Sequence, residues 1–290
     1  MGEQMRSHRR GIRVGCLVLL VTALGALGLA GSASARLTGD FTVFGQCPFG
    51  NPEVRKCISA INQGGEIAIG GTRVALVNPV TIQGGFTRQD EEGNARMVDA
   101  VNGMTMPKTP QPVPGGLLGL ASAGKAPLLL QTLLKSFSAK LNQVNATLEF
   151  ARPTSEVVMN ENNFAGETGP GLTMPVKVHL ENPLLGGSCY IGSSAAPIVL
   201  ALTAGTTSPP PPNLPIAGTL GLIEFLAEGS ILEVSDAVLV DNSFSVPKAS
   251  GCGGTFSSPP SPAGHNTVIM KSKLMVGAAA AVRRDNEENP

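Results

Sequence analysis

Alternation of apolar and polar residues is the dominant pattern of this chain, and it predicts a succession of β-strands. In residues 66–77 two alternating runs flank Gly70-Gly71, which is typical of a β-hairpin with a tight turn. Further alternating or continuously apolar runs predict strands at residues 80–83, 144–150, 176–180, 198–203, 231–240 and 267–276. This series of strands indicates a mainly β fold, either an antiparallel β-sandwich or a distorted barrel.

Helical periodicity is rarer and predicts two or three short helices packed on the sheet. Asn51-Pro52-Glu53 is a favourable helix start, and apolar residues follow at helical spacing as far as Ile61, with Cys57 on the buried face. The strongest amphipathic pattern covers residues 125–143, and we expect that helix to face the core. After an alanine run the chain becomes charged and unpatterned, which predicts a disordered tail over residues 278–290.

The first 35 residues have the order of a secretory signal peptide. Four arginines precede an apolar run at residues 14–31, and Ala33-Ser34-Ala35 offers small residues for cleavage before Arg36. The alternative is an uncleaved anchor, but a run of 18 residues is at the short limit for a membrane-spanning helix. We therefore expect a mature chain that is secreted, either extracellular or in the cell envelope, and is not inserted in a membrane.

Cleavage removes Cys16 and leaves an even number of cysteines: Cys47, Cys57, Cys189 and Cys252. In an exported chain this predicts two disulfides, for which three pairings are possible. We favour Cys47–Cys57 and Cys189–Cys252, worth about 3 and about 4 kcal/mol in the chain-entropy treatment. A zinc site fits less well, because no two of these cysteines lie two to four residues apart.

The Cys189–Cys252 pairing also bears on the domain organisation. It would span the proline-rich connection at residues 208–215, which is expected to be an extended loop. We therefore expect a single disulfide-stapled, β-rich domain over residues 36–277, with the loop inside it.

Composition narrows the function classes. Without the leader the chain has 17 basic and 20 acidic residues, so a net charge of about −3 argues against nucleic-acid binding. The sequence has no tryptophan and one tyrosine, which leaves few rings on which a carbohydrate could stack.

Two motifs resemble ligand sites but lack essential groups. Residues 119–125 have the spacing of a phosphate-binding loop, yet Ala126 has no hydroxyl for magnesium and Pro127 has no amide hydrogen. The acidic stretch at residues 88–96 lacks the alternating oxygen ligands of a calcium loop, so a solvated hairpin tip is the better interpretation.

Catalysis is also poorly supported by the sequence. Only His179 and His265 follow the leader; His179 alternates outward on a strand and should face solvent, and His265 lies in a turn. The chain contains neither a Gly-x-Ser-x-Gly elbow nor a His-Glu-x-x-His helix, although a triad using His265 or a carboxylate pair could still assemble in space. We therefore assign no catalytic, cofactor-binding or metal-binding residue.

Several blocks of the chain resemble a group of secreted actinobacterial proteins for which no activity is known. The blocks are residues 44–49, 110–116, 182–186, 189–193, 206–212 and 263–266. The resemblance spans most of the mature chain and implies the bacterial exterior or envelope as the location. The leading hypothesis is a non-catalytic structural or binding protein, whose partners would be other envelope or extracellular components. The alternatives are a secreted hydrolase with a dispersed site and a carrier of small apolar ligands.

Overall fold

The computed structural model describes residues 36–120, 139–253 and 260–289. The leader with its cleavage site lies outside the described residues, as does most of the amphipathic segment at 125–143. Of that segment the structure describes the short helix α3 (Ala139–Asn142). The phosphate-loop-like residues are described only as far as Leu120, where helix α1 (Gly116–Leu120) ends.

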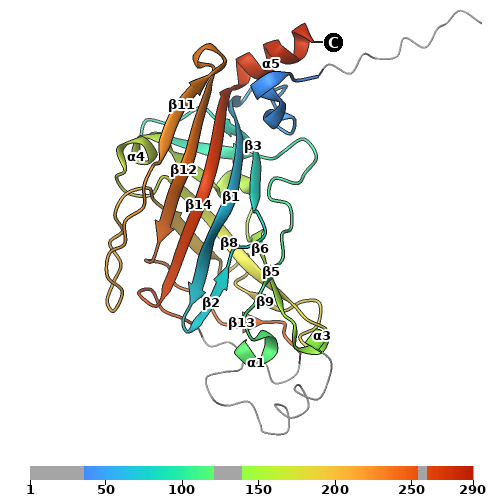
Figure 1. Cartoon of the computed structure of the whole chain (residues 1–290), viewed down its shortest axis with the longest axis vertical. Coiled ribbons are helices and arrows are strands. Elements are labelled where there is room, and N and C mark those ends of the chain that lie inside the picture. The colour runs from blue at the N-terminus through green and yellow to red at the C-terminus, as the bar shows by residue number, and fades with distance from the viewer. Residues whose placement is uncertain (1–35, 121–138, 254–259, 290) are drawn as a thin grey trace, which may run out of the picture.

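Fourteen strands form one antiparallel sheet that folds into two layers (Figure 1). The first layer contains β11 (Leu222–Leu226), β12 (Ile231–Asp241), β14 (Asn266–Ala278), β1 (Val54–Ile69), β2 (Thr72–Ala75) and β3 (Thr81–Thr87). The second contains β4 (Asn94–Val98), β5 (Gln111–Pro112), β6 (Asn145–Phe150), β7 (Val158–Asn160), β8 (Leu172–Glu181), β9 (Tyr190–Ile191), β10 (Ile198–Leu202) and β13 (Ala249–Ser250). The prediction of a mainly β, antiparallel fold is confirmed.

The two layers are connected on both sides, so the hydrogen-bonded strands form a ring. On one side β4 pairs with both β3 and β7. On the other side Thr203, just after β10, donates to the Val240 carbonyl of β12 at 3.0 Å and accepts from the Val240 amide at 2.9 Å. Of the two architectures that the sequence left open, this closure corresponds to the distorted barrel.

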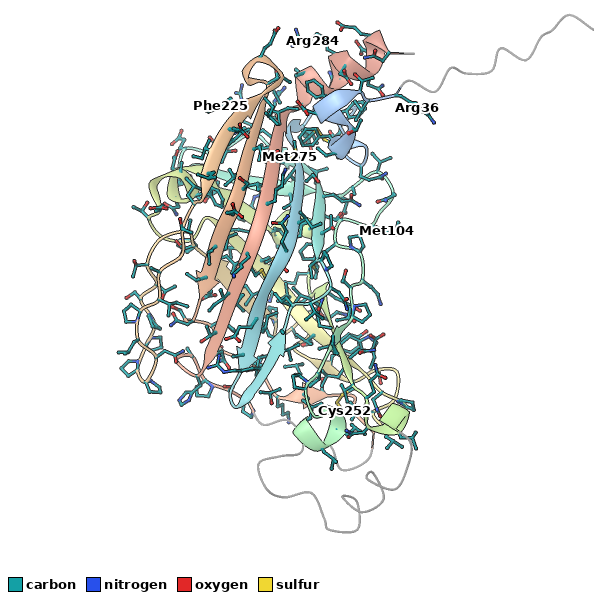
Figure 2. The ribbon with its side chains drawn as sticks, in the orientation of Figure 1. Arg36, Met104, Phe225, Cys252, Met275 and Arg284 are labelled. Carbon is teal, nitrogen blue, oxygen red and sulfur yellow. A yellow bond between two sulfur atoms is a disulfide. The ribbon has the colours of Figure 1, made fainter. Side chains whose placement is uncertain are left out.

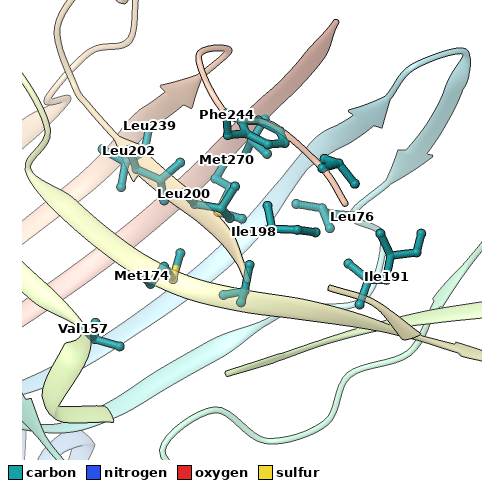
Figure 3. Close-up of a cluster of buried hydrophobic side chains, with 14 of the residues drawn as sticks. Leu76, Val157, Met174, Ile191, Ile198, Leu200, Leu202, Leu239, Phe244 and Met270 are labelled. Carbon is teal, nitrogen blue, oxygen red and sulfur yellow. The ribbon is translucent and has the colours of Figure 1, made fainter. Parts of the chain in front are cut away.

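The interior of the ring is filled by side chains from the inward positions of both layers (Figure 3). Met174 and Leu200 of the second layer lie opposite Leu239 and Met270 of the first, with Phe244 beside them. Each large apolar side chain that is buried in this way stabilises the fold by about 1.5–3 kcal/mol. From Val176 to Glu181 buried and half-buried residues alternate on β8, and this alternation fixes its orientation in the barrel.

The C-terminal segment corrects the prediction of a disordered tail over residues 278–290. Helix α5 (Ala279–Glu288) packs on one end of the barrel, where Val282 is fully buried. Small alanines on its inner face allow the helix to approach β1 and β14 closely, and Phe44 and Met275 complete the cluster. At this end the two described ends of the chain also meet, since Arg36 N–H donates to the Asn289 carbonyl at 2.9 Å (Figure 2).

Residues 51–61 also depart from the sequence prediction, since the helix expected there is wrong. Residues 51–53 form a turn and residues 54–61 are the start of β1, which is hydrogen bonded to β3 on one side and β14 on the other. Asn51 closes only a local turn, in which its side-chain oxygen accepts from Glu53 N–H at 2.9 Å. Two neighbouring strands outweigh a local helix start, because residues 56–61 of β1 are paired on both edges.

The disulfides have the pairing that the sequence favours. Cys47–Cys57 ties the loop after the 3-10 helix η1 (Gly39–Phe44) to β1, and Cys189–Cys252 ties the start of β9 to the loop after β13. The connection at residues 208–215 leads from β10 to β11, which belong to the same sheet. None of the helices in the described ranges is long and apolar enough to cross a membrane.

The burial of α5 predicts that Val282→Ala lowers the free energy of unfolding by about 2 kcal/mol, because two buried methyl groups are lost. Arg284→Ala, at an exposed position of the same helix, should change it by less than about 0.5 kcal/mol. Urea unfolding measures both. Equal stability of the two variants would contradict the packing of α5 on the barrel.

The disulfides should differ in their contributions. Cys189–Cys252 closes a loop of 63 residues and Cys47–Cys57 one of 10, so replacing the first pair by alanines should cost about 1–2 kcal/mol more than replacing the second. The comparison requires urea unfolding of the two double variants under oxidising conditions. A larger loss from the shorter loop would show that loop length does not govern these disulfides.

Candidate functional site

A group of polar side chains lies on the outer face of the second layer, where β6, β8 and β9 pair. The register places Glu149 opposite Lys177, and His179 between Thr147 and Tyr190. Because side chains alternate across a strand, these residues share the face that points away from the core. We call the following set the His179 cluster: Lys108, Thr147, Glu149, Lys177, His179, Glu181 and Tyr190.

Glu149 is the anchor of this cluster, because two lysines bind its carboxylate. Lys108 Nζ lies 2.9 Å from Oε1 and Lys177 Nζ lies 3.5 Å from Oε2. Burial raises the pKa of Glu149, but the hydrogen bond and charge of Lys108, helped by Lys177, outweigh it and leave the pKa below its ordinary value. The same contact raises the pKa of Lys108. At neutral pH the three groups therefore form a stable charged unit.

His179 corrects the expectation of a solvent-facing side chain, because only 12% of it is exposed. The Tyr190 ring covers it in a nearly parallel stack, with centroids 4.4 Å apart, and Lys177 Nζ lies 4.3 Å from the centre of the Tyr190 ring. Both nitrogens of the imidazole are buried and have no hydrogen-bond partner among the described residues. Its Nδ1 lies 3.8 Å from Glu149 Oε1 and 3.9 Å from Glu181 Oε1, beyond hydrogen-bonding distance.

Glu181 differs from Glu149 in its surroundings. Its Oε2 accepts a hydrogen bond from the Thr147 hydroxyl at 2.9 Å, and 40% of its side chain is exposed. Among the residues that the structure describes, no lysine or arginine forms an ion pair with it. Glu181 is therefore the carboxylate of the cluster that has no lysine ion pair within the described residues.

The exposed side of Glu181 borders an open hollow of about 540 Å³. The lining includes Gln143, Asn145, His179, Glu181, Gly186 and Gly187. Asn182 holds the wall of this hollow in place, since its side-chain amide donates to the carbonyls of Leu141 and Gln143 at 2.9 and 2.6 Å. The hollow is therefore polar, open to solvent and fixed by hydrogen bonds.

The other candidates from the sequence have simpler surroundings. His265 is exposed in the turn before β14. Asp90, at the tip of the β3–β4 hairpin, accepts from the backbone amides of Glu92 and Asn94, and the bond from Asn94 contributes most to lowering its pKa. Across the described part of the chain, no three His, Cys, Asp or Glu side chains are placed to hold a metal ion.

Apolar cavities lie between the two layers within the described part of the chain. Two cavities between the layers have volumes of about 100 and about 70 Å³. Ile67, Leu148 and Val178 line the first, and Phe86, Met159 and Leu274 line the second. Both volumes are below the ~300 Å³ at which pockets for small molecules usually begin.

Comparison with known proteins finds no matching family, no similar curated protein and no similar solved structure. The His179 cluster and the hollow beside it are therefore the features of the molecule that bear on its function. Sequence reasoning placed His179 on an outward position but did not identify its partners. The alternation in β6 and β8 could have put Glu149, Lys177 and Glu181 on that face, whereas the pairing with Tyr190 and the approach of Lys108 have no local sequence pattern.

The ion pairs of Glu149 give a prediction about pH. Because its pKa is lowered in the folded state, its stabilising contribution is present above the ordinary glutamate pKa and is lost as the pH falls through the folded value. Glu149→Gln should therefore lower the free energy of unfolding by about 1 kcal/mol at pH 7, and the difference should shrink below about pH 4.

Urea unfolding across this pH range provides the measurement. The control is Glu156→Gln, which removes a more exposed ion pair with Arg152 and should have a smaller effect. If Glu149→Gln were as stable as the parent protein at pH 7, the lysines would not stabilise the cluster.

Proposed function

We propose that the protein is exported, cleaved before Arg36 and active outside the cytosol as a non-catalytic binding protein. Its binding surface is the outer face of β6, β8 and β9 around the His179 cluster. Two disulfides in a turn-rich barrel support an oxidising location. Arg36, the first residue after the expected cleavage site, already takes part in the fold through its bond to Asn289. The resemblance to secreted actinobacterial proteins favours the bacterial envelope or exterior.

The observation that carries the binding role is the concentration of rare side chains beside the hollow. The only tyrosine of the chain stacks on one of the two histidines that follow the leader. A buried imidazole without hydrogen-bond partners lowers stability, and an uncompensated carboxylate lies next to it. Groups that do not serve stability and border an open hollow are those that a ligand would use.

The same geometry favours binding over hydrolysis. A nucleophile has to lie next to a base that activates it. In the His179 cluster the Thr147 hydroxyl donates to Glu181, but Thr147 is buried with 1% of its surface exposed, so a substrate could not reach it, and both lysines are held by Glu149. The third hypothesis, a carrier of small apolar ligands, is disfavoured by the small volumes of the two interior cavities.

Export can be tested by expressing the full chain in a bacterial host and analysing the culture supernatant by mass spectrometry. We expect a chain that begins at Arg36 and whose four cysteines react with an alkylating reagent only after reduction. Ala35→Leu should retain the leader, because the cleavage site requires small residues, whereas Ala26→Leu in the apolar run should be processed normally. A full-length product inside the cells with free thiols would overturn the proposal.

A further inference from the structure

Glu149 and Glu181 lie on the same outer face of the second layer but differ in their exposure and in their ion pairs. Glu149 is largely buried and is balanced by Lys108 and Lys177. Glu181 lies four residues after Lys177 on the same face of β8, and within the described residues the side-chain hydrogen bond to its carboxylate comes from the Thr147 hydroxyl. Both nearby lysines are bound to Glu149, and Glu181 forms no ion pair with a lysine or arginine of the described residues, so its Oε1 is placed to pair with a cation from outside the protein.

The hollow beside Glu181 offers uncharged hydrogen-bonding groups as its other polar contacts. Asn145 lies directly opposite Glu181 in the β6–β8 pairing, and Gln143 precedes it by two residues. Each amide provides an oxygen that can accept and an NH₂ group that can donate. The lining thus combines one full negative charge with neutral acceptors.

Glycines keep the opposite wall of the hollow open. At Gly186 and Gly187 a Cβ atom would meet no other atom within 4 Å. Gly186 has a φ of +77°, which requires glycine, whereas Gly187 has an ordinary backbone conformation and could carry a side chain. The space that these residues leave is part of the 540 Å³ that a ligand could occupy.

We propose that this hollow binds a small organic cation through a primary ammonium group that pairs with Glu181 Oε1. The neutral amides of Gln143 and Asn145 would accept further hydrogen bonds from the same ligand. A divalent metal fits less well, because such ions need several carboxylate or carbonyl ligands and the hollow has one carboxylate. An organic cation as ligand specifies the proposed binding function and therefore rests on that proposal.

The protein has a built-in reporter for this site. It contains no tryptophan and a single tyrosine, so its emission comes from Tyr190 alone when the excitation wavelength lies beyond the phenylalanine absorption band. Tyr190 stacks on His179, which lines the hollow. A ligand beside Glu181 would change the surroundings of this stack and thereby the emission.

The experiment titrates the purified protein, with both disulfides formed, with putrescine and with its uncharged analogue butanediol. We expect a saturable change of Tyr190 emission with putrescine and at least about tenfold weaker binding of butanediol. Glu181→Gln should weaken putrescine binding by about tenfold or more, because it removes the charge and keeps an oxygen for Thr147. Added salt should also weaken binding, since the ion pair is exposed.

Two further variants separate this site from general charge effects. Gly187→Phe should fill the hollow and weaken putrescine binding by about tenfold without touching the carboxylate. Glu224→Gln, on the exposed strand β11, should leave the affinity unchanged within about twofold. Unfolding in urea checks that each variant is folded.

The assignment of an organic cation as ligand would be overturned if butanediol bound as tightly as putrescine. It would also be overturned if Glu181→Gln and Gly187→Phe both left the putrescine affinity unchanged. The absence of any saturable response would overturn it as well. These outcomes are independent of the export experiment, because the titration uses purified protein. If export failed but the purified protein still bound putrescine, the proposed extracellular function would be overturned and the assignment of the cation site would stand.

Discussion

The register of β8 is the constraint on which the rest of this structure depends. β8 pairs with β6, β7, β9 and β10, so its pleat decides what points into the barrel and what points outward. Val176, Val178 and Leu180 enter the core, while Lys177, His179 and Glu181 form the outer row. A slip of one residue would bury the charged row and expose the apolar one, so the packing that stabilises the barrel also fixes the candidate site.

A second stabilising unit holds the other end of the barrel, remote in sequence from the site. Helix α5 and the segment that follows Arg36 cover the ends of β1 and β14, and the Cys47–Cys57 disulfide lies in the same apolar cluster. Asp285 accepts hydrogen bonds from both the backbone and the hydroxyl of Thr38 at 2.8 Å. Because these contacts join residues about 250 positions apart, they restrain the whole chain rather than one loop.

Sequence reasoning succeeded where the structure is local and failed where it depends on distant partners. The Gly70-Gly71 hairpin was predictable because its strands and turn are adjacent, and alternation identified β6, β8 and β12. The prediction of a helix after Asn51 failed because that segment pairs as a strand with β3 and β14, which are distant in sequence. His179 was expected in solvent because its cover, Tyr190, lies eleven residues away across a loop. The ordered α5 depends on a surface that only the assembled barrel provides.

The difference between the two glutamates follows from the residue opposite each one. In an antiparallel pair, directly opposed side chains interact most strongly, and opposite charges there are favourable. Lys177 lies opposite Glu149, whereas Asn145 lies opposite Glu181. A lysine at position 145 would have been placed to balance the second carboxylate and to narrow the hollow with its long side chain. The amide of Asn145 does neither, so one residue on β6 is sufficient to leave Glu181 accessible beside an open polar hollow, with the Thr147 hydroxyl as its hydrogen-bond donor and no lysine opposite it.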